Sequence, residues 1–162
     1  MLISAGSAFE RKPSLYKNKD EEDLRDMFLL FLETRYENTS GHGEAFNRKG
    51  KTDILLKYAP DGSNIFVAEC KVWTGEIGLG AAIDQLLSYL THRDSKTALM
   101  MFVRNKNFNP VLITAETAIK NHPNFLSFTP KTSTSSYGCM FSLPGNEMSK
   151  IQLEVMLFHF LD

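Results

Sequence analysis

Asp53, Glu69 and Lys71 are the residues whose types and spacing best suit chemistry in this 162-residue chain. Glu69 and Lys71 are two positions apart, so they share one face if they lie in a β-strand. Two carboxylates about 4 Å apart repel each other by roughly 4 kcal/mol at an effective dielectric near 20, and a bound cation relieves this repulsion. Carboxylate oxygens suit Mg²⁺ or Mn²⁺. The pattern therefore predicts a metal held by Asp53 and Glu69, with the backbone carbonyl of Cys70 as a further ligand.

The reaction that suits these residue types is hydrolysis of a phosphodiester. A Mg²⁺ ion held by one or two carboxylates keeps coordination sites for water and for a phosphate. Lys71 could position or help to deprotonate the attacking water and stabilise charge in the transition state. An Asp followed later by Glu-x-Lys is also common as ordinary solvated surface charge. The catalytic interpretation is favoured by the hairpin described next, by the apolar run before Glu69 and by the glycines after Trp73.

Two strands joined by a tight turn would bring these residues together. Residues 52–58 and 64–73 are predicted strands, and the Pro-Asp-Gly-Ser segment at 60–63 is typical of a turn. In such a hairpin, residues whose numbers sum to about 122 to 124 lie opposite one another, which places Asp53 beside Glu69. The second strand begins apolar on both faces, as a central strand does.

The rest of the pattern predicts an α/β fold with a central mixed sheet flanked by helices, in the order helix, three strands, helix, strand. The acidic residues 20–23 suit a helix N-terminus, and apolar residues then recur at helical spacing. The other predicted elements are a strand around 44–47, a helix at 81–93, a strand at 96–104, a helix at 111–121, and strands at 125–128 and 151–160.

Composition bounds the domain organisation and the compartment. Residues 1–19 mix Ser, Gly, Pro and Lys without periodicity, so we expect a basic, flexible or loosely docked N-terminal arm before a single domain at 20–162. The net charge of -1 gives no global basic field, so nucleic-acid binding would need a local cluster of Lys and Arg. Cys70 and Cys139 are expected to be small core residues in a reducing compartment. With no signal-like or membrane-spanning run, we expect a soluble, cytoplasmic protein without a membrane partner.

About half of the chain resembles a subgroup of the PD-(D/E)xK, or restriction-endonuclease-like, nuclease superfamily, which occurs as small standalone proteins and in prokaryotic defence proteins. The resemblance implies the same element order and matches Asp53, Glu69 and Lys71 to the catalytic residues. Thr52 replaces the usual Pro before Asp53, a variation that the superfamily tolerates. The matching runs are Gly43-Glu44-Ala45-Phe46-Asn47, Gly50-Lys51-Thr52-Asp53-Ile54-Leu55-Leu56, Ala68-Glu69-Cys70-Lys71-Val72-Trp73 and Ala82-Ile83-Asp84-Gln85-Leu86-Leu87-Ser88-Tyr89.

The resemblance also implies further catalytic residues. Gln85 matches the helix glutamine of the family. Glu44 matches the additional acidic residue that members often bring near the metal from an upstream helix or strand. The alternatives for that role are Glu22 and Glu33 on the first predicted helix, and Glu44 could instead be an exposed loop carboxylate.

Four residues are candidates for nucleic-acid contact. Lys51 lies within the matching run, two residues before Asp53. Gln85, Tyr89 and His92 line one side of the predicted helix, so Tyr89 and His92 could face the substrate backbone. The alternative for these two is an amphipathic rim packed on the sheet edge. Trp73 either stacks on a base or packs against the core.

The sequence thus predicts a Mg²⁺-dependent endonuclease that acts on DNA, with a place in prokaryotic defence or mobile-element biology. A homodimer is expected because one such site cuts one strand. The competing hypotheses are a non-catalytic nucleic-acid-binding or assembly module that retains the nuclease fold, and an RNA-directed nuclease activated by a partner.

Overall fold

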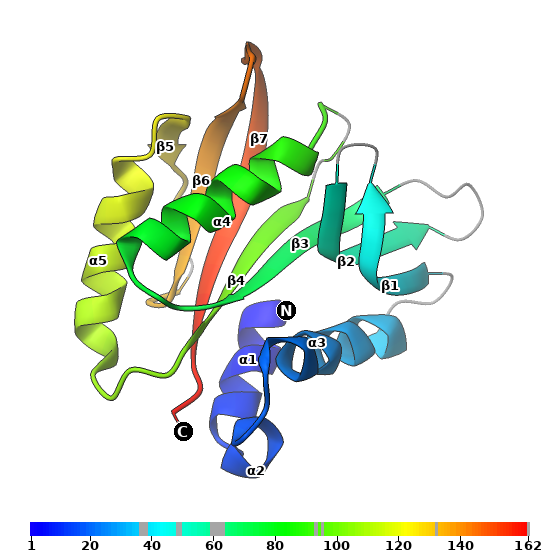
Figure 1. Cartoon of the computed structure of the whole chain (residues 1–162), viewed down its shortest axis with the longest axis vertical. Coiled ribbons are helices and arrows are strands. Elements are labelled where there is room, and N and C mark those ends of the chain that lie inside the picture. Colours follow the sequence, from blue (N-terminus) through cyan, green and yellow to red (C-terminus); the bar gives the residue numbers. More distant parts are fainter. Residues whose placement is uncertain are drawn as a thin grey trace.

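The computed structural model describes residues 1–35, 39–47, 50–58, 64–92, 94, 96–131 and 133–161, without the side chains of residues 39–47, 50–52 and 58. Twelve helices and strands follow one another within these ranges (Figure 1). They are α1 (Leu2–Glu10), α2 (Pro13–Tyr16), α3 (Glu21–Arg35), β1 (Thr39–Asn47), β2 (Gly50–Tyr58), β3 (Asn64–Val72), α4 (Glu76–Tyr89), β4 (Thr97–Val103), α5 (Phe108–Lys120), β5 (Phe125–Phe128), β6 (Ser136–Leu143) and β7 (Asn146–His159).

The strands of the described chain form one mixed sheet in the order β1-β2-β3-β4-β7-β6-β5. Strands β1, β2 and β3 are antiparallel neighbours. Strands β3, β4 and β7 are parallel, and β6 and β5 then continue the sheet in antiparallel fashion. The predicted α/β class with a mixed sheet and flanking helices is confirmed, and α3-β1-β2-β3-α4-β4 follows the predicted order.

Two hydrophobic layers hold helices against opposite faces of this sheet. Strand β4 is buried along its whole length, as expected for a central parallel strand. Its side chains alternate: Leu99 and Met101 pack in the layer with α4 and α5, whereas Met100 and Phe102 pack in the layer with α1, α2 and α3. Figure 1 shows α4 and α5 together on one face and the N-terminal helices apart from them.

The predicted hairpin register is confirmed. Ile54 lies opposite Ala68 and Leu56 lies opposite Phe66, so the residue numbers of these pairs sum to 122. The strand predicted around 44–47 is present and is longer, as β1. These two results place Asp53 on the strand next to Glu69.

The structure differs from the sequence prediction at α4, β6 and β7. Helix α4 begins at Glu76 rather than at residue 81, since Gly78 and Gly80 are accommodated within it. Strand β6 was not predicted, because its Ser, Gly and Cys content resembles that of a loop. Hydrogen bonding to β7 makes this segment a strand despite its low β-propensity. Strand β7 itself begins at Asn146 rather than at residue 151.

Residues 1–19, for which the sequence predicted a basic, flexible or loosely docked arm, contain two helices. This segment forms α1 and α2, and Leu2 and Tyr16 are buried in the layer that contains Phe28 and Phe160. The Tyr16 and Phe160 rings stack with centroids 4.9 Å apart. Long-range packing, which sequence periodicity does not report, therefore orders this segment.

Gly6 allows α1 to approach β7 closely, and this gives a first prediction. A Cβ atom at Gly6 would overlap the ring of Phe158. Gly6→Ala is therefore expected to lower the free energy of unfolding by about 1–3 kcal/mol, as over-packing of a core does.

Gly80→Ala on α4 is the matched control, because a Cβ there meets no atom within 4 Å. Its helix propensity should raise stability by about 0.5–1 kcal/mol. Urea denaturation measures both; a stabilised Gly6→Ala would contradict the docking of α1.

Both cysteines are buried free thiols, which confirms the expectation that they are core residues. Burial raises the pKa of Cys139 to about 12, with a further contribution from the charge of Glu154. Burial likewise raises the pKa of Cys70 well above its ordinary value. Neither thiol is therefore suited to act as a nucleophile at neutral pH. In the part of the chain that is described, no helix is long and apolar enough to cross a membrane.

Candidate functional site

The candidate site lies where β2 and β3 separate. The described pairing between these strands ends at Ile54 and Ala68, which leaves the next amides on that side of β3 without a strand partner. Two carboxylates take the place of the missing carbonyls: Asp53 Oδ2 accepts a hydrogen bond from the Cys70 amide at 2.8 Å, and Glu21 Oε2 accepts one from the Val72 amide at 2.7 Å. The need to satisfy buried amides thus fixes both side chains.

Glu21 reaches this opening from the first turn of α3. The helix is capped by Asp20, whose Oδ1 accepts a hydrogen bond from the Asp23 amide at 2.9 Å. Three acidic residues follow the cap, which the helix macrodipole favours at this end. The acidic cluster that predicted a helix N-terminus therefore also supplies a residue of the site.

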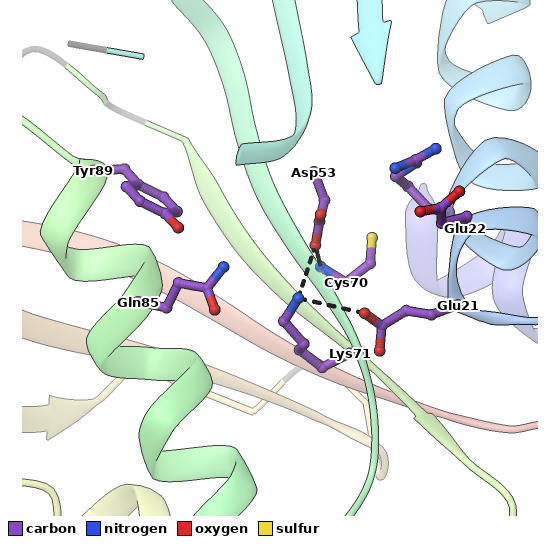
Figure 2. Close-up of a pocket in the computed structure, with 8 residues that line it drawn as sticks. Glu21, Glu22, Asp53, Cys70, Lys71, Gln85 and Tyr89 are labelled. Carbon is purple, nitrogen blue, oxygen red and sulfur yellow. Dashed lines mark hydrogen bonds and ion pairs between the residues drawn. The ribbon is translucent and has the colours of Figure 1, made fainter. Parts of the chain in front are cut away.

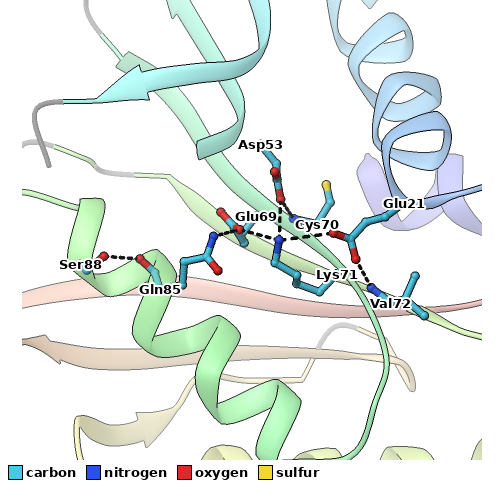
Figure 3. A network of polar contacts seen from close by, with 8 residues as sticks. All are labelled: Glu21, Asp53, Glu69, Cys70, Lys71, Val72, Gln85 and Ser88. Carbon is cyan, nitrogen blue, oxygen red and sulfur yellow. Dashed lines mark hydrogen bonds and ion pairs between the residues drawn. The ribbon is translucent and has the colours of Figure 1, made fainter. Parts of the chain in front are cut away.

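The Lys71 ammonium lies among three carboxylates (Figure 3). Its Nζ atom is 3.0 Å from Glu69 Oε1, 3.5 Å from Asp53 Oδ2 and 3.4 Å from Glu21 Oε1. The side chain is 28% exposed, so these contacts are only partly screened by water. In the metal-free protein, Lys71 is the cation that these three carboxylates share.

Glu69 is the most unusual group of the site, because its side chain is 0% exposed. Its Oε1 atom accepts hydrogen bonds from Lys71 and from the Gln85 amide of α4. Its Oε2 atom is buried and has no hydrogen-bond partner among the described residues. A buried carboxylate oxygen without a partner is costly, and such atoms often mark the position of an ion or water.

Helix α4 forms the opposite wall because the chain turns sharply after β3. Gly75 precedes the helix with φ at 107°, a conformation that residues with a Cβ rarely adopt. The turn lays α4 across the sheet, where Gln85 reaches Glu69. Figure 2 shows Gln85 and Tyr89 on one side of the cavity and Glu21 and Glu22 on the other.

A cavity of about 350 Å³ lies between these walls. Asp53 of β2 and Cys70 and Lys71 of β3 form its floor, and α3 and α4 form its sides. The lining residues are Glu21, Glu22, Arg25, Asp53, Cys70, Lys71, Gln85 and Tyr89. The cavity therefore opens directly onto the carboxylates and the ammonium described above.

The pKa values of Glu69 and Lys71 are both raised, which favours the neutral form of Glu69 and the charged form of Lys71. Burial, with the negative charge of Asp53, raises the pKa of Glu69 to about 7 against the lowering influence of Lys71. Burial by itself lowers the pKa of Lys71, but the hydrogen bond to Glu69 and the charges of Glu69, Asp53 and Glu21 outweigh it, so the pKa lies above its ordinary value. Lys71 thus stays protonated at neutral pH and is suited to stabilise negative charge rather than to accept a proton.

The side chains of the site can be compared with the ligands that Mg²⁺ prefers. Among the described residues, no three His, Cys, Asp or Glu side chains form a group that could hold a metal. Mg²⁺ does not require such a cage, because it is commonly bound by one or two carboxylates, several waters and substrate phosphate. Asp53 and Glu69 supply two carboxylates, and the unpartnered Glu69 Oε2 supplies a free oxygen. The residues present therefore fit Mg²⁺ or Mn²⁺.

Comparisons of the chain with protein-family models, curated proteins and solved structures found no match. The roles of the site residues are therefore inferred from geometry and chemistry. The structure brings together four of the predicted catalytic residues, Asp53, Glu69, Lys71 and Gln85. Tyr89 lines the same cavity.

Two other candidates lie away from this cavity. His92 is exposed beyond the end of α4 and borders a separate cavity with Leu143 and Asn146. Trp73 packs against the hydrophobic layer of α4 and α5 and borders another cavity near Asn107. For Trp73 this agrees with the packing alternative. Nucleic-acid contact by either residue stays a prediction.

Three further predictions are not decided by the described atoms. Glu44 lies in β1, between Gly43 and Ala45, which pair with β2, but its side chain lies outside the described residues. The side chain of Lys51 lies outside them as well. Cys70 contributes its amide to the site through Asp53. That its carbonyl binds a metal stays a prediction.

Sequence reasoning missed Glu21, which contacts both Lys71 and the Val72 amide. The alternatives considered for an extra acidic residue were its neighbour Glu22, which lines the cavity, and Glu33, which is exposed. The acidic first turn of α3 was the available signal. Helical spacing does not show which of two adjacent glutamates faces a distant strand.

The raised pKa of Glu69 predicts an unusual pH dependence of stability. Between about pH 4.5 and pH 7, the folded protein holds a proton on Glu69 that the unfolded chain has lost. This contribution to stability is complete below pH 4.5 and is lost as the pH rises to 7, with a slope of up to ~1.4 kcal/mol per pH unit. Urea denaturation of the metal-free protein from pH 5 to 8 measures it. Glu69→Gln, which cannot titrate, should lack this component, and an identical profile in both proteins would contradict the assignment.

Proposed function

We propose that this chain is a divalent-metal-dependent endonuclease that hydrolyses phosphodiester bonds, with DNA as its substrate. The observation that carries the proposal is the Glu69 carboxylate. It is completely buried with one oxygen unpartnered among the described residues, and it lies beside Asp53 and Lys71 at a cavity. A protein seldom keeps such a group unless a cation or a reaction uses it.

The chain order around the site supports the same proposal. Helix α3, strands β1, β2 and β3, helix α4 and strand β4 follow the order that the PD-(D/E)xK resemblance implies. Asp53 lies on the second strand, Glu69 and Lys71 lie on the third, and Gln85 lies on the following helix. A restriction-endonuclease-like core is therefore part of the proposal.

Each residue then has a defined role in hydrolysis. Asp53 and Glu69 would hold the metal, which when bound polarises a phosphoryl oxygen and lowers the pKa of a coordinated water. The Cys70 amide keeps the Asp53 carboxylate in place, and Gln85 does the same for Glu69. Lys71, protonated and hydrogen-bonded to Glu69, is placed to stabilise the negative charge that develops on the phosphate.

The charge balance of Lys71 favours one alternative. Its ammonium contacts Glu21, Asp53 and Glu69, so it offsets part of their negative charge without a metal. A non-catalytic nucleic-acid-binding or assembly module could keep the residues for this structural purpose. Such a module would bind nucleic acid without cutting it.

A cleavage assay separates the two functions. The purified protein is incubated with single- and double-stranded DNA and with RNA, in Mg²⁺, Mn²⁺ or EDTA. We expect cleavage of DNA in Mg²⁺ or Mn²⁺ and none in EDTA. Cleavage of RNA alone would reject DNA as the substrate, and binding without cleavage under all conditions would support the module.

Asp53→Asn is the variant that excludes a contaminating nuclease. The change keeps the shape of the side chain but removes the charge that a metal requires, and a cleavage loss of at least about 10²-fold is expected. The amide oxygen of the new side chain can still accept the hydrogen bond from Cys70, so folding should be retained. Unchanged cleavage by this variant would contradict the proposed site.

A further inference from the structure

A second cavity, of about 470 Å³, lies where the parallel strands β3 and β4 end. The segment after β3, the loop after β4 and the first two turns of α5 form its walls. The lining residues are Trp73, Gly75, Asn105, Lys106, Asn107, Pro110, Val111 and Thr114. This lining contains no Asp or Glu, whereas three acidic residues line the cavity of the candidate site. The Trp73 cavity, as we call it, therefore does not repel a phosphate.

Trp73 is held in place by the sheet and by α5. Its amide donates a hydrogen bond to the Phe102 carbonyl at 2.9 Å, so the pairing with β4 continues past the end of β3. By alternation, its side chain lies on the same face as Glu69 and Lys71. The ring packs against the hydrophobic layer of α4 and α5 and stays partly exposed. Within the described part of the chain, its indole N–H has no hydrogen-bond partner. Packing thus orders the ring without covering it.

The loop after β4 is anchored, but its polar side chains are not engaged. His159 Nε2 donates to the Asn105 carbonyl at 2.7 Å, and the His159 ring stacks on Phe108 with centroids 4.7 Å apart. Asn107 is the N-cap of α5, yet its side chain makes no capping hydrogen bond, as an Asn in this position usually does. Among the described residues, the side chains of Asn105 and Lys106 have no polar partner either.

These groups together match a nucleotide. A partly exposed tryptophan ring can stack on a base of any type. The amides of Asn105 and Asn107 can donate to and accept from the edge of that base, and the Lys106 ammonium can contact a phosphate. A metal ion would find no carboxylate in this lining, and a small anion would use neither the ring nor both amides.

The Trp73 cavity is close to the candidate site along β3. Two residues of an extended strand span roughly 7 Å, which separates the Cα atoms of Lys71 and Trp73. Successive nucleotides of a DNA strand are about 3.4 Å apart along the helix axis, so this distance corresponds to a few nucleotides at most. We propose that a base of the substrate strand near the cut bond stacks on Trp73, an inference that rests on the proposed nuclease function.

The stacked base sets the class of DNA that fits. A base inside a duplex is stacked and paired, and its extrusion costs a few kcal/mol. A base of single-stranded DNA reaches the Trp73 ring without this cost. The site therefore favours single-stranded DNA, or an unpaired end, over an intact duplex.

Fluorescence of the full chain tests this directly, because Trp73 is its only tryptophan. The protein is titrated in EDTA, which prevents cleavage, with oligothymidine, with an abasic oligomer of equal length and with thymidine 5′-monophosphate. We expect only oligothymidine to quench Trp73 at low concentration, and annealing it to its complement should remove the quenching. Equal quenching by the abasic oligomer or by the duplex overturns the proposal. Equal affinity for the mononucleotide replaces the strand by a free nucleotide, which also overturns it.

Matched variants test the contacts by the anisotropy of labelled oligothymidine. Trp73→Leu should lower affinity by about 5- to 150-fold, the range for one stacked base, whereas Trp73→Phe keeps a ring and should retain most of the affinity. Asn107→Ala should lower it by about 2- to 10-fold. Asn109→Ala, an exposed residue on α5 that does not line the cavity, should bind as wild type does.

Circular dichroism and urea denaturation check that the variants fold. A folded Trp73→Leu with wild-type affinity overturns the proposal. If Trp73→Leu does not fold, unchanged affinity in Asn107→Ala overturns it, because that side chain makes no capping bond whose loss would unfold α5.

The metal conditions distinguish this inference from the proposed function. Stacking on Trp73 uses no metal, so quenching and its loss on annealing should be seen in EDTA. If they are seen while no DNA is cut in Mg²⁺ or Mn²⁺, the base site stands and the nuclease proposal fails. If cleavage depends on Mg²⁺ while Trp73→Leu binds and cuts as wild type does, only the base site fails.

Discussion

Glu69→Gln is expected to lower cleavage by on the order of 10³-fold or more, which corresponds to about 4 kcal/mol of transition-state stabilisation. The change removes one of the two carboxylates available to the metal and leaves the side-chain shape almost intact. Mg²⁺ should then no longer raise the melting temperature. The metal-free variant should instead be more stable than wild type at pH 8, by on the order of 1–3 kcal/mol, because a carboxylate with a pKa of about 7 is no longer ionised in a buried position.

Cleavage kinetics and thermal unfolding with and without Mg²⁺ measure these effects. Glu33→Gln is the control, since Glu33 is exposed on α3 and does not line the cavity. It should cleave as wild type does and respond equally to Mg²⁺. Cleavage by Glu69→Gln at the wild-type rate would remove Glu69 from the mechanism. If metal-free Glu69→Gln were less stable than wild type at pH 8, the neighbouring groups would compensate the charge of Glu69 better than we infer.

Lys71→Met is expected to lower cleavage about as much as Glu69→Gln does. Its effect on stability should be the opposite, because Lys71→Met should destabilise the protein. Without the ammonium, Glu21, Asp53 and Glu69 face one another with no cation. Breaking a partly buried ion pair of this kind costs about 3 kcal/mol. The loss should be largest above pH 7 and smaller at pH 5, where Glu69 takes up a proton.

The response to metal separates Lys71 from Glu69. In Lys71→Met both carboxylates remain and their competing cation is gone, so Mg²⁺ should bind more tightly and restore much of the lost stability, without restoring cleavage. Lys106→Met, an exposed lysine beyond β4, should leave stability within about 0.5 kcal/mol of wild type. Thermal unfolding over a Mg²⁺ titration measures this. A variant that cuts normally, or that Mg²⁺ does not stabilise, would argue against a shared site for Lys71 and the metal.

The central part of the fold could be predicted from sequence because its signals are local. The Pro-Asp-Gly-Ser segment at 60–63 predicted the register that β2 and β3 have, and strict alternation along each strand then decides which residues meet. The strand register and this alternation are enough to place Asp53, Glu69 and Lys71 together. Gln85 followed from the resemblance, and the structure shows it bonded to Glu69.

The parts that could not be predicted depend on contacts between distant segments. Helix α1 owes its place to Gly6 fitting against Phe158, which lie at opposite ends of the chain. Glu21 enters the site because the Val72 amide of β3 has no carbonyl of β2 to bond to and donates to Glu21 instead. This is apparent only once the pairing of the strands is known. Arg25 reads as an ordinary charged helix residue until α3 is placed beside the cavity.

The separation of β2 from β3 also makes the backbone a reporter of the site. The Cys70 and Val72 amides are bonded to Asp53 and Glu21 rather than to another strand. Their proton chemical shifts and exchange rates therefore follow the charge and position of those carboxylates. The amide peaks of these two residues in an NMR spectrum should therefore shift when a cation or a phosphate binds. This would report binding in the unmodified protein, without any cleavage reaction.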